Sequence, residues 1–205
     1  MLRPETVLEC AKKAGVKLSL GIGLLEQEAS RDGKIALNVW GNDRAPNGGT
    51  DDWGWDEVTE SKYRRYKERR GPTGAGGRQG VGPTQLTWRT LQDAADRLGG
   101  CWKPENSILV GFTHLKSLID EHGYEVGVER YNGVGRVEYS KSVREKASRW
   151  HDVLADAGRG EEEAPEDDPE RDGAYPEVHF GDSGPEIEKL QRALNAHADS
   201  GSLDL

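Results

Sequence analysis

The stretch Pro104–His122, PENSILVGFTHLKSLIDEH, carries the strongest helical pattern of the chain. Its large apolar residues recur every three or four positions and so share one helical face: Ile108, Leu109, Phe112, Leu115, Leu118 and Ile119. Pro104 suits the first turn of a helix, where a missing N–H leaves no bond unmade, and Gly123 is typical of the position just after a helix ends. The stretch therefore predicts an amphipathic helix over residues 104–122.

Outward from this stretch, helical spacing of apolar residues continues over most of the first 159 residues. The spacing predicts further helices over residues 4–14, 16–29, 59–70, 87–98, 125–130 and 137–157. Residues 31–58 and 71–82 are rich in glycine, and we expect long loops there, the first with room for a short hairpin. Loops of such length in a small domain are usually functional or disordered. The expected fold class is a mainly α domain with long glycine-rich loops.

The remaining residues are expected to form a linker over 160–176 and a partial helical segment over 177–205. Residues 161–172 hold eight acidic side chains and one basic side chain, and such like charges keep a linker extended. The segment beyond the linker is shorter than the roughly 40 residues that usually fold unaided. The chain is therefore divided into a body (residues 1–159), an acidic linker and a truncated C-terminal segment.

The net charge of −9 over 205 residues comes from the linker and the C-terminal segment. Residues 1–160 carry 25 basic and 23 acidic side chains, whereas nucleic-acid-binding proteins normally present a strongly basic face. Nucleic acid is therefore not expected as a partner. No apolar run approaches the roughly 18 residues that a membrane span needs, so no membrane insertion is expected. The charged N-terminus also lacks the apolar segment of a secretory signal.

The two cysteines, Cys10 and Cys101, are too few for a disulfide framework. Either they pair with each other or they stay reduced as small buried side chains, and the second alternative is favoured. The five histidines form no pair with the spacing of metal ligands. We therefore expect neither a metal nor another cofactor.

The helix expected over residues 16–29 carries two glutamates beside its apolar face. On a helical wheel that face is formed by Leu18, Ile22, Leu25 and Ala29. Glu26 and Glu28 fall on opposite flanks of it, and the wheel does not choose between them. A carboxyl at such a margin is partly desolvated, which raises its pKa and suits a general acid. Gly21 lies on the side of Glu28 and would leave room for a ligand, although on the wheel alone the favoured interpretation of both glutamates is ordinary flanking charges.

Four short segments resemble motifs of the lysozyme-like superfamily, specifically its goose-type lysozyme and lytic transglycosylase group. LEQEAS at residues 25–30 resembles the segment in which the catalytic glutamate ends a helix shortly before a serine. GVGPTQL at residues 80–86 resembles the Gly-Leu-Met-Gln segment, and RYNG at residues 130–133 resembles the Ala-Tyr-Asn-Ala-Gly segment. Glu-Tyr at residues 138–139, followed by Val143, resembles a later Tyr-x-x-x-Val element. The four segments occur in the family's order, so the expected fold is an α+β lysozyme-like one.

The resemblance implies that Glu28 is the catalytic acid and that Gln85, Tyr131 and Asn132 bind the sugars. Gln85 follows a Gly-Val-Gly-Pro turn, so its amide could bind an N-acetyl or hydroxyl group, or it could simply close the turn. Asn132 stands at the end of a helix, where Asn is a common left-handed cap. Tyr139 is expected to be a core residue.

The loop over residues 31–58 adds further candidates for sugar binding. Trp40, Trp53 and Trp55 offer aromatic faces for sugar stacking, with anchoring of the loop in a small core as an alternative at least equally favoured for Trp40. Glycosidases usually employ a second carboxylate, for which Asp43 is the candidate. The resembled group often works with one glutamate and uses the substrate's N-acetyl or 6-hydroxyl group as the internal nucleophile.

Residues 178–194, VHFGDSGPEIEKLQRAL, resemble the opening of a helical peptidoglycan-binding module. With the motifs of the body, this resemblance implies an endolysin of an actinobacterial phage that cleaves the β-1,4 bond between N-acetylmuramic acid and N-acetylglucosamine. Such a protein would be made in the host cytoplasm without a signal peptide and would act on the cell wall as a monomer, with peptidoglycan as its partner. The alternative is a non-catalytic wall-binding or virion protein on the same scaffold.

Overall fold

The mainly α fold class expected from the helical spacing is confirmed. The computed structural model describes residues 4–31, 34–36, 38–41, 56–70 and 79–158. Within these ranges the helices are α1 (Pro4–Ala14), α2 (Leu18–Ala29), α3 (Glu60–Arg70), α4 (Arg89–Arg97), α5 (Pro104–His122), α6 (Tyr124–Tyr131) and α7 (Val137–Gly158). The expected linker and C-terminal segment lie outside the described residues.

A short hairpin follows α2 directly. It pairs β1 (Ser30–Arg31) antiparallel with β2 (Lys34–Ile35), so that Ser30 lies opposite Ile35. Single bridges then join Val39 to Glu57 and Trp40 to Val81. The hairpin expected within residues 31–58 is therefore present at the start of that segment.

Local signals explain where the helices begin and end. Helix α5 has the bounds that its sequence predicts, with Pro104 in its first turn and Gly123 after it at φ 79°. Helix α1 ends in a Schellman motif, because Gly15 has a φ of 68° and the N–H of Val16 donates to the carbonyl of Ala11 at 3.0 Å. That bond keeps Val16 outside α2, which begins two residues later than expected.

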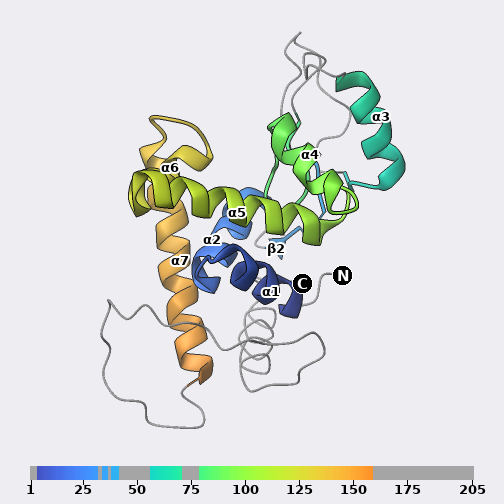
Figure 1. Ribbon diagram of the computed structural model, residues 1–205. Helices are drawn as coiled ribbons and strands as arrows, with labels where there is room; N and C mark the ends of the chain where they lie inside the picture. Colours follow the sequence, from blue (N-terminus) through green and yellow to red (C-terminus); the bar gives the residue numbers. More distant parts are fainter. Residues whose placement is uncertain (1–3, 32–33, 37, 42–55, 71–78, 159–205) are drawn as a thin grey trace.

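Two hydrophobic clusters form the interior, and α5 belongs to both. The first, here called the α2–α7 lobe, is built from α1, α2, α6, α7 and the middle of α5 around Phe112. The second, the α3–α4 lobe, contains α3, α4 and side chains from the intervening segments, and Val110 of α5 lies in it. Figure 1 shows α5 running across the molecule with α6 and α7 near one end and α3 and α4 near the other.

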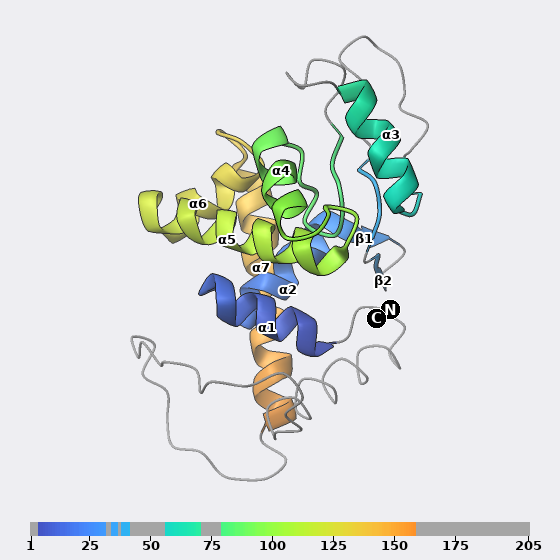
Figure 2. The same cartoon turned by 45° about the vertical axis from the view of Figure 1, so that its right-hand side comes forward.

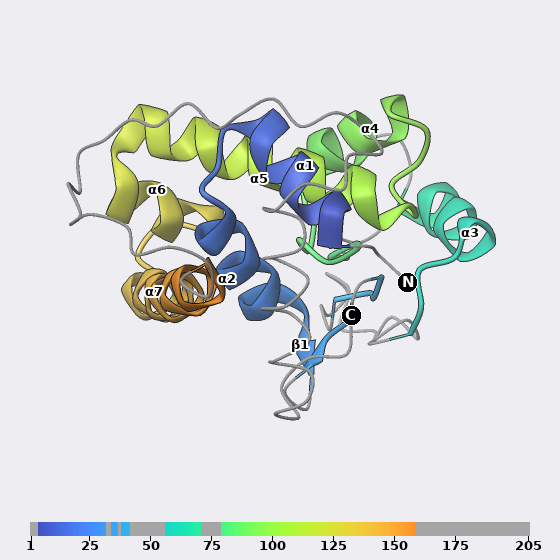
Figure 3. The same ribbon diagram turned by 90° about the horizontal axis from the view of Figure 1, so that it is seen from below.

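Glycines set the contacts of α2. A Cβ added at Gly23 would lie 2.8 Å from the backbone nitrogen of Ala147, so the absence of a side chain lets α2 and α7 meet closely. A Cβ at Gly21 would lie 2.7 Å from the ring of Phe112. The space expected beside Gly21 for a ligand is therefore filled by the core. Figure 3 shows α2 beside α7 and leading at its C-terminal end into β1.

Helix α7 extends below α1, away from the end that contacts α6 (Figure 2). The lengths and hydropathies of the helices can be compared with the expectation that no segment inserts into a membrane. None of the described helices combines the length and the apolar character that crossing a bilayer requires.

Candidate functional site

Glu28 stands at the C-terminal end of α2, one residue before the buried Ala29. Its side chain is partly exposed, and its Oε1 accepts a hydrogen bond from the hydroxyl of Tyr139. Tyr139 lies in the first turn of α7, 111 residues later, and is 9% exposed. Burial, reinforced by the nearby Glu28 carboxylate, raises the pKa of Tyr139. The phenol therefore keeps its proton and remains a donor to Glu28.

A second phenol lies close to the same carboxylate. Burial, and next the charge of Glu28, raise the pKa of Tyr131 well above its ordinary value. The Tyr131 hydroxyl donates to the backbone carbonyl of Thr84 at 2.7 Å. Thr84 is itself anchored to α5, because its Oγ1 donates to the carbonyl of Ser107 at 2.7 Å. Tyr131 thus joins the end of α6 to the segment that carries Gln85.

Glu26 makes different contacts from Glu28. Its Oε2 accepts bonds from Arg149 at 2.6 Å and from the indole nitrogen of Trp150 at 2.8 Å. Gln27, between the two glutamates, accepts from Ser142 at 2.8 Å. The three consecutive side chains of α2 therefore bond to α7 at three different heights along its axis. Only Glu28 reaches the first turn of α7, which carries Tyr139.

Gln85 occupies a strained position in the turn before α4. It is the only described residue other than glycine with a positive φ, at 49°. Its Nε2 donates to the carbonyls of Gly82 at 2.9 Å and Val39 at 3.4 Å, so the amide nitrogen closes the turn. No described residue donates to its Oε1, and the side chain is partly exposed. Left-handed backbone at a bulky residue is uncommon and often marks a functional site.

A buried glutamine fixes both ends of this turn to α4. Gln92 is fully buried, and its Nε2 donates to the carbonyls of Leu86 at 2.7 Å and Gln79 at 2.9 Å. Its Oε1 accepts a bond from Arg70 at 2.5 Å. The amide of Gln92 is therefore bonded on both sides, and residues 79–86 are held by hydrogen bonds as well as by packing.

Asn132 follows the last residue of α6 and is exposed. Its φ is −100°, so it is not the left-handed cap that was expected; Gly133, at φ 103°, takes that conformation instead. The Asn132 side chain makes no hydrogen bond to another described residue. Asp43, the candidate second carboxylate, lies outside the described residues.

Trp40 does not present a face to solvent. It is 0% exposed, and its ring lies 6.4 Å from that of Tyr63 and 5.3 Å from that of Tyr66, centroid to centroid. The proposed sugar-stacking role of Trp40 is therefore corrected to packing, because the α3–α4 lobe covers the whole indole. Trp53 and Trp55 lie outside the described residues.

The two cysteines are buried and form no disulfide, as the favoured alternative states. Burial raises the pKa of Cys10 to about 11 and that of Cys101 to about 12. Both side chains therefore stay as thiols at neutral pH. They are packing residues and supply no nucleophile to the site.

Sequence reasoning missed two residues of this arrangement. Tyr139 was expected only in the core, yet it both packs there and binds Glu28. The sequence does hold one signal for a role at the site, because Tyr139 belongs to the segment that resembles the Tyr-x-x-x-Val element. Thr84 contributes its carbonyl to Tyr131, and backbone contacts of that kind leave no mark in a sequence.

The arrangement brings Tyr139 of α7 and Tyr131 of α6 to one partly exposed carboxyl group at the end of α2, and Tyr131 is in turn bonded to the turn before α4. A carboxyl held by a neutral phenol can exchange a proton with a bound molecule. In the described part of the chain, no three His, Cys, Asp or Glu side chains are placed to hold a metal ion. Comparisons with protein-family models, curated proteins and solved structures found no match to this chain.

Proposed function

We propose that this chain degrades bacterial peptidoglycan by cleaving the β-1,4 glycosidic bond between N-acetylmuramic acid and N-acetylglucosamine, with Glu28 as the general acid. The observation that carries the proposal is the setting of Glu28. It is partly exposed, bonded to the neutral phenol of Tyr139 and close to Tyr131, whereas Glu26 is paired with the cation of Arg149 and bonded to the indole of Trp150. Three of the resembled segments supply Glu28, Tyr131 and Tyr139, and the fourth is bonded to Tyr131 through the carbonyl of Thr84.

In the proposed reaction, Glu28 gives its proton to the glycosidic oxygen as the bond from that oxygen to the anomeric carbon of muramic acid breaks. The electron-poor anomeric carbon is then captured by water or by the substrate's own N-acetyl or 6-hydroxyl group. Capture by the 6-hydroxyl group produces an anhydro ring, and that hydroxyl returns a proton to Glu28. Capture that ends with water produces a free reducing end, and the water returns a proton to Glu28.

Each neighbour of Glu28 has a separate part in the proposal. Tyr139 orients the carboxyl through its hydrogen bond. Tyr131 holds the turn through the carbonyl of Thr84, and this turn carries the partly exposed Gln85. The Oε1 of Gln85 and the amide of Asn132 are suited to the hydroxyl and N-acetyl groups of a sugar.

The test compares two substitutions on one helix. Glu28→Gln removes the acid and retains the shape of the side chain, so we expect the clearing of wall suspensions to slow by about 100-fold or more. Glu26→Gln is the matched control, because it neutralises a glutamate two residues away that faces Arg149 and Trp150. We expect this control to keep near-normal activity per folded molecule. Near-normal clearing by Glu28→Gln would refute the role of Glu28.

Mass spectrometry of digested sacculi identifies the reaction. Reducing ends among the released fragments indicate water as the final acceptor, and anhydromuropeptides indicate internal capture. The unsubstituted chain is expected to release one of the two. Release of neither, together with retention of the protein on the walls, would replace the enzymatic proposal by the non-catalytic wall-binding alternative.

A further inference from the structure

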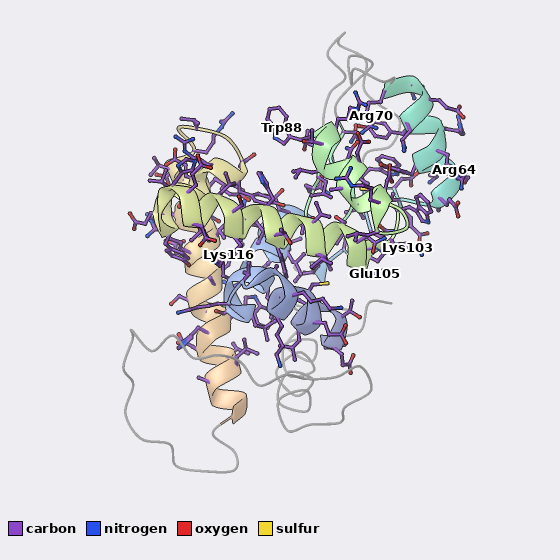
Figure 4. The ribbon with its side chains drawn as sticks, viewed as in Figure 1. Arg64, Arg70, Trp88, Lys103, Glu105 and Lys116 are labelled. Atoms are coloured by element: carbon purple, nitrogen blue, oxygen red, sulfur yellow. The ribbon has the colours of Figure 1, made fainter. Side chains whose placement is uncertain are left out.

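Arg70, the last residue of α3, is a cation inside the α3–α4 lobe. Its side chain is only 5% exposed, whereas that of Arg64, on the same helix, is 68% exposed. Figure 4 shows Arg70 between α3 and α4 and Arg64 on the outer side of α3. Removing a charge from water is costly unless hydrogen bonds and opposite charges replace the water. Such a cation stays buried only where its neighbours hold it firmly.

The partners of Arg70 are one carboxylate and one amide. Its Nη2 donates to Asp93 at 3.0 Å, and its Nη1 donates to Oε1 of Gln92 at 2.5 Å. The guanidinium also lies over the ring of Tyr66, 5.8 Å from the centroid. Asp93 has a second cation, Arg89, at 3.1 Å. The carboxylate is therefore paired even without Arg70, whereas in the described part of the chain no other charged group reaches the amide of Gln92.

The bond from Arg70 fixes which way the amide of Gln92 points. An arginine only donates hydrogen bonds, so the atom that it meets must be the amide oxygen. The amide nitrogen faces the opposite way, where it donates to the carbonyls of Leu86 at 2.7 Å and Gln79 at 2.9 Å. A cation on the oxygen also polarises the amide, which strengthens both of these bonds. Arg70 therefore acts on the backbone at residues 79 and 86 through one buried side chain.

The backbone between these two carbonyls contains Gln85 in its strained conformation. Gln85 has a φ of 49°, a conformation that persists only where the surrounding structure imposes it. Hydrogen bonds on either side of it provide this restraint. On one side the Oγ of Ser107 donates to the carbonyl of Val81 at 3.2 Å, and on the other Gln92 donates to Leu86. Losing the bond at Leu86 would let the backbone of Gln85 relax and its side chain turn.

We propose that Arg70 is a positioning residue for Gln85, which it holds in place through Gln92. The inference rests on the proposed function, in which the Oε1 of Gln85 binds a hydroxyl or N-acetyl group of the glycan. Arg70 itself does not touch the sugar, because it is buried and reaches the turn only through Gln92. The sugar site thus depends on α3, a helix that carries none of the residues assigned to catalysis or sugar binding.

The experiment removes the cation and keeps most of the bulk of its side chain. Arg70→Met leaves Asp93 paired with Arg89, so no carboxylate is left alone. Binding of the hexamer of N-acetylglucosamine is measured by calorimetry on the full chain in a Glu28→Gln background. We expect about ten-fold weaker binding for Arg70→Met, and binding within about two-fold of the parent for Arg70→Lys, which keeps a donor. Arg64→Met is the matched control and should bind as its parent does.

A double-mutant cycle separates positioning from stability. Gln85→Gly removes the side chain that Arg70 would position, and glycine accepts the positive φ without strain. In this background Arg70→Met should change binding by less than about two-fold, although it still lowers the midpoint of thermal unfolding. Additive effects of the two substitutions on binding would overturn the inference, because Arg70 would then act without Gln85. An unchanged affinity of Arg70→Met in the parent background would overturn it as well.

Gln92→Glu is the second variant, for the case that Arg70→Met does not fold. Glutamate has the same shape and pairs with the Arg70 cation, but its ionised carboxylate cannot donate to the carbonyls at residues 79 and 86. Binding should again weaken about ten-fold, and by less than about two-fold once Gln85→Gly is present. Full affinity of Gln92→Glu, or additivity in its cycle, would overturn the inference.

Kinetics on soluble glycan strands give another readout, with Glu28 intact. Arg70→Met should raise KM about ten-fold and leave kcat within about two-fold, since binding to Gln85 is lost while the acid is kept. An unchanged KM would contradict the positioning role. Absence of hexamer binding by the parent would remove the sugar site at Gln85 and this inference with it. Failure of Glu28 as the acid appears separately, as activity retained by Glu28→Gln.

Discussion

The hydroxyl of Tyr139 donates a hydrogen bond to Oε1 of Glu28, joining the end of α2 to the first turn of α7. Glu26 and Gln27 are bonded to α7 as well, further along it. The position of Glu28 is therefore set by the packing of two helices and by one phenol that keeps its proton. Such rigidity suits the proposed role of Glu28 as a proton donor, because a bound sugar would have to meet the carboxyl group in one orientation.

We expect Tyr139→Phe to lower the rate of glycan cleavage about ten-fold, because a hydrogen bond to an ionisable group is worth about 1.5–3 kcal/mol. A donor to the ionised carboxylate favours that form, so its loss should move the alkaline limb of the pH–rate profile to higher pH. Release of soluble fragments, measured between pH 4 and 9, tests both effects.

Tyr63→Phe is the matched control for this substitution. Tyr63 is buried too, at 0% exposed, and its hydroxyl donates to Asp96 at 3.2 Å within the α3–α4 lobe. It should lose stability and keep the wild-type pH–rate profile. Identical profiles for both variants and the parent would show that Tyr139 does not act on Glu28.

Gly23→Ala tests the close approach of α2 and α7. The new Cβ would lie 2.8 Å from the nitrogen of Ala147 and 3.1 Å from the carbonyl oxygen of Val143. These are backbone atoms that cannot turn away, so we expect a loss of about 1–3 kcal/mol in the free energy of unfolding. The gain of roughly 0.5–1 kcal/mol in helix propensity offsets part of it. Urea denaturation measures the difference.

Gly21→Ala provides the comparison on the same helix. Its Cβ would meet the outer ring carbons of Phe112, which belong to a side chain that can shift. It should therefore destabilise the protein less than Gly23→Ala and have a smaller effect on cleavage. The reverse order of stabilities would contradict the proposed cause.

The stability of the protein should fall as the pH falls below 6.5. Burial lowers the pKa of His114 from its ordinary value of 6.5, and its ring lies 5.7 Å from that of Tyr131. The unfolded chain then binds a proton at higher pH than the folded chain, so this contribution is fully present above 6.5 and decreases below it. Thermal unfolding between pH 8 and pH 5 measures the slope.

His114→Gln should flatten this dependence, because the titrating group is gone. His151→Gln, at an exposed position of α7, should keep the parent's slope. Equal slopes for all three proteins would assign the acid sensitivity to other groups.

Most of the helical framework could be predicted from the chain. Apolar spacing and glycines located α1 and α5 to the residue, because helix ends depend on local dihedral angles and caps. The start of α4 was expected two residues early, at residue 87. Thr87 bonds to the carbonyl of Gln85 instead, and Trp88 keeps an extended backbone.

The candidate site was predicted less completely. Tyr131 and Gln85 were named for contact with sugars, but their hydrogen bonds to Thr84 and Gly82 show that both also build the turn. Trp40 was named for the same purpose and is an internal residue. An aromatic side chain in a polar loop can point inwards or outwards, and only the packing of the lobe around it decides which.

By itself the sequence determined the helices, both ends of α1 and α5, and the presence of two glutamates beside one apolar stripe. Tertiary structure decided that Glu28 meets Tyr139 while Glu26 meets Trp150. Helical periodicity records how a residue is oriented about its own helix axis. Which helix lies on that side depends on how distant segments pack. Here the close contact of Gly23 in α2 with Ala147 in α7 places these two helices side by side.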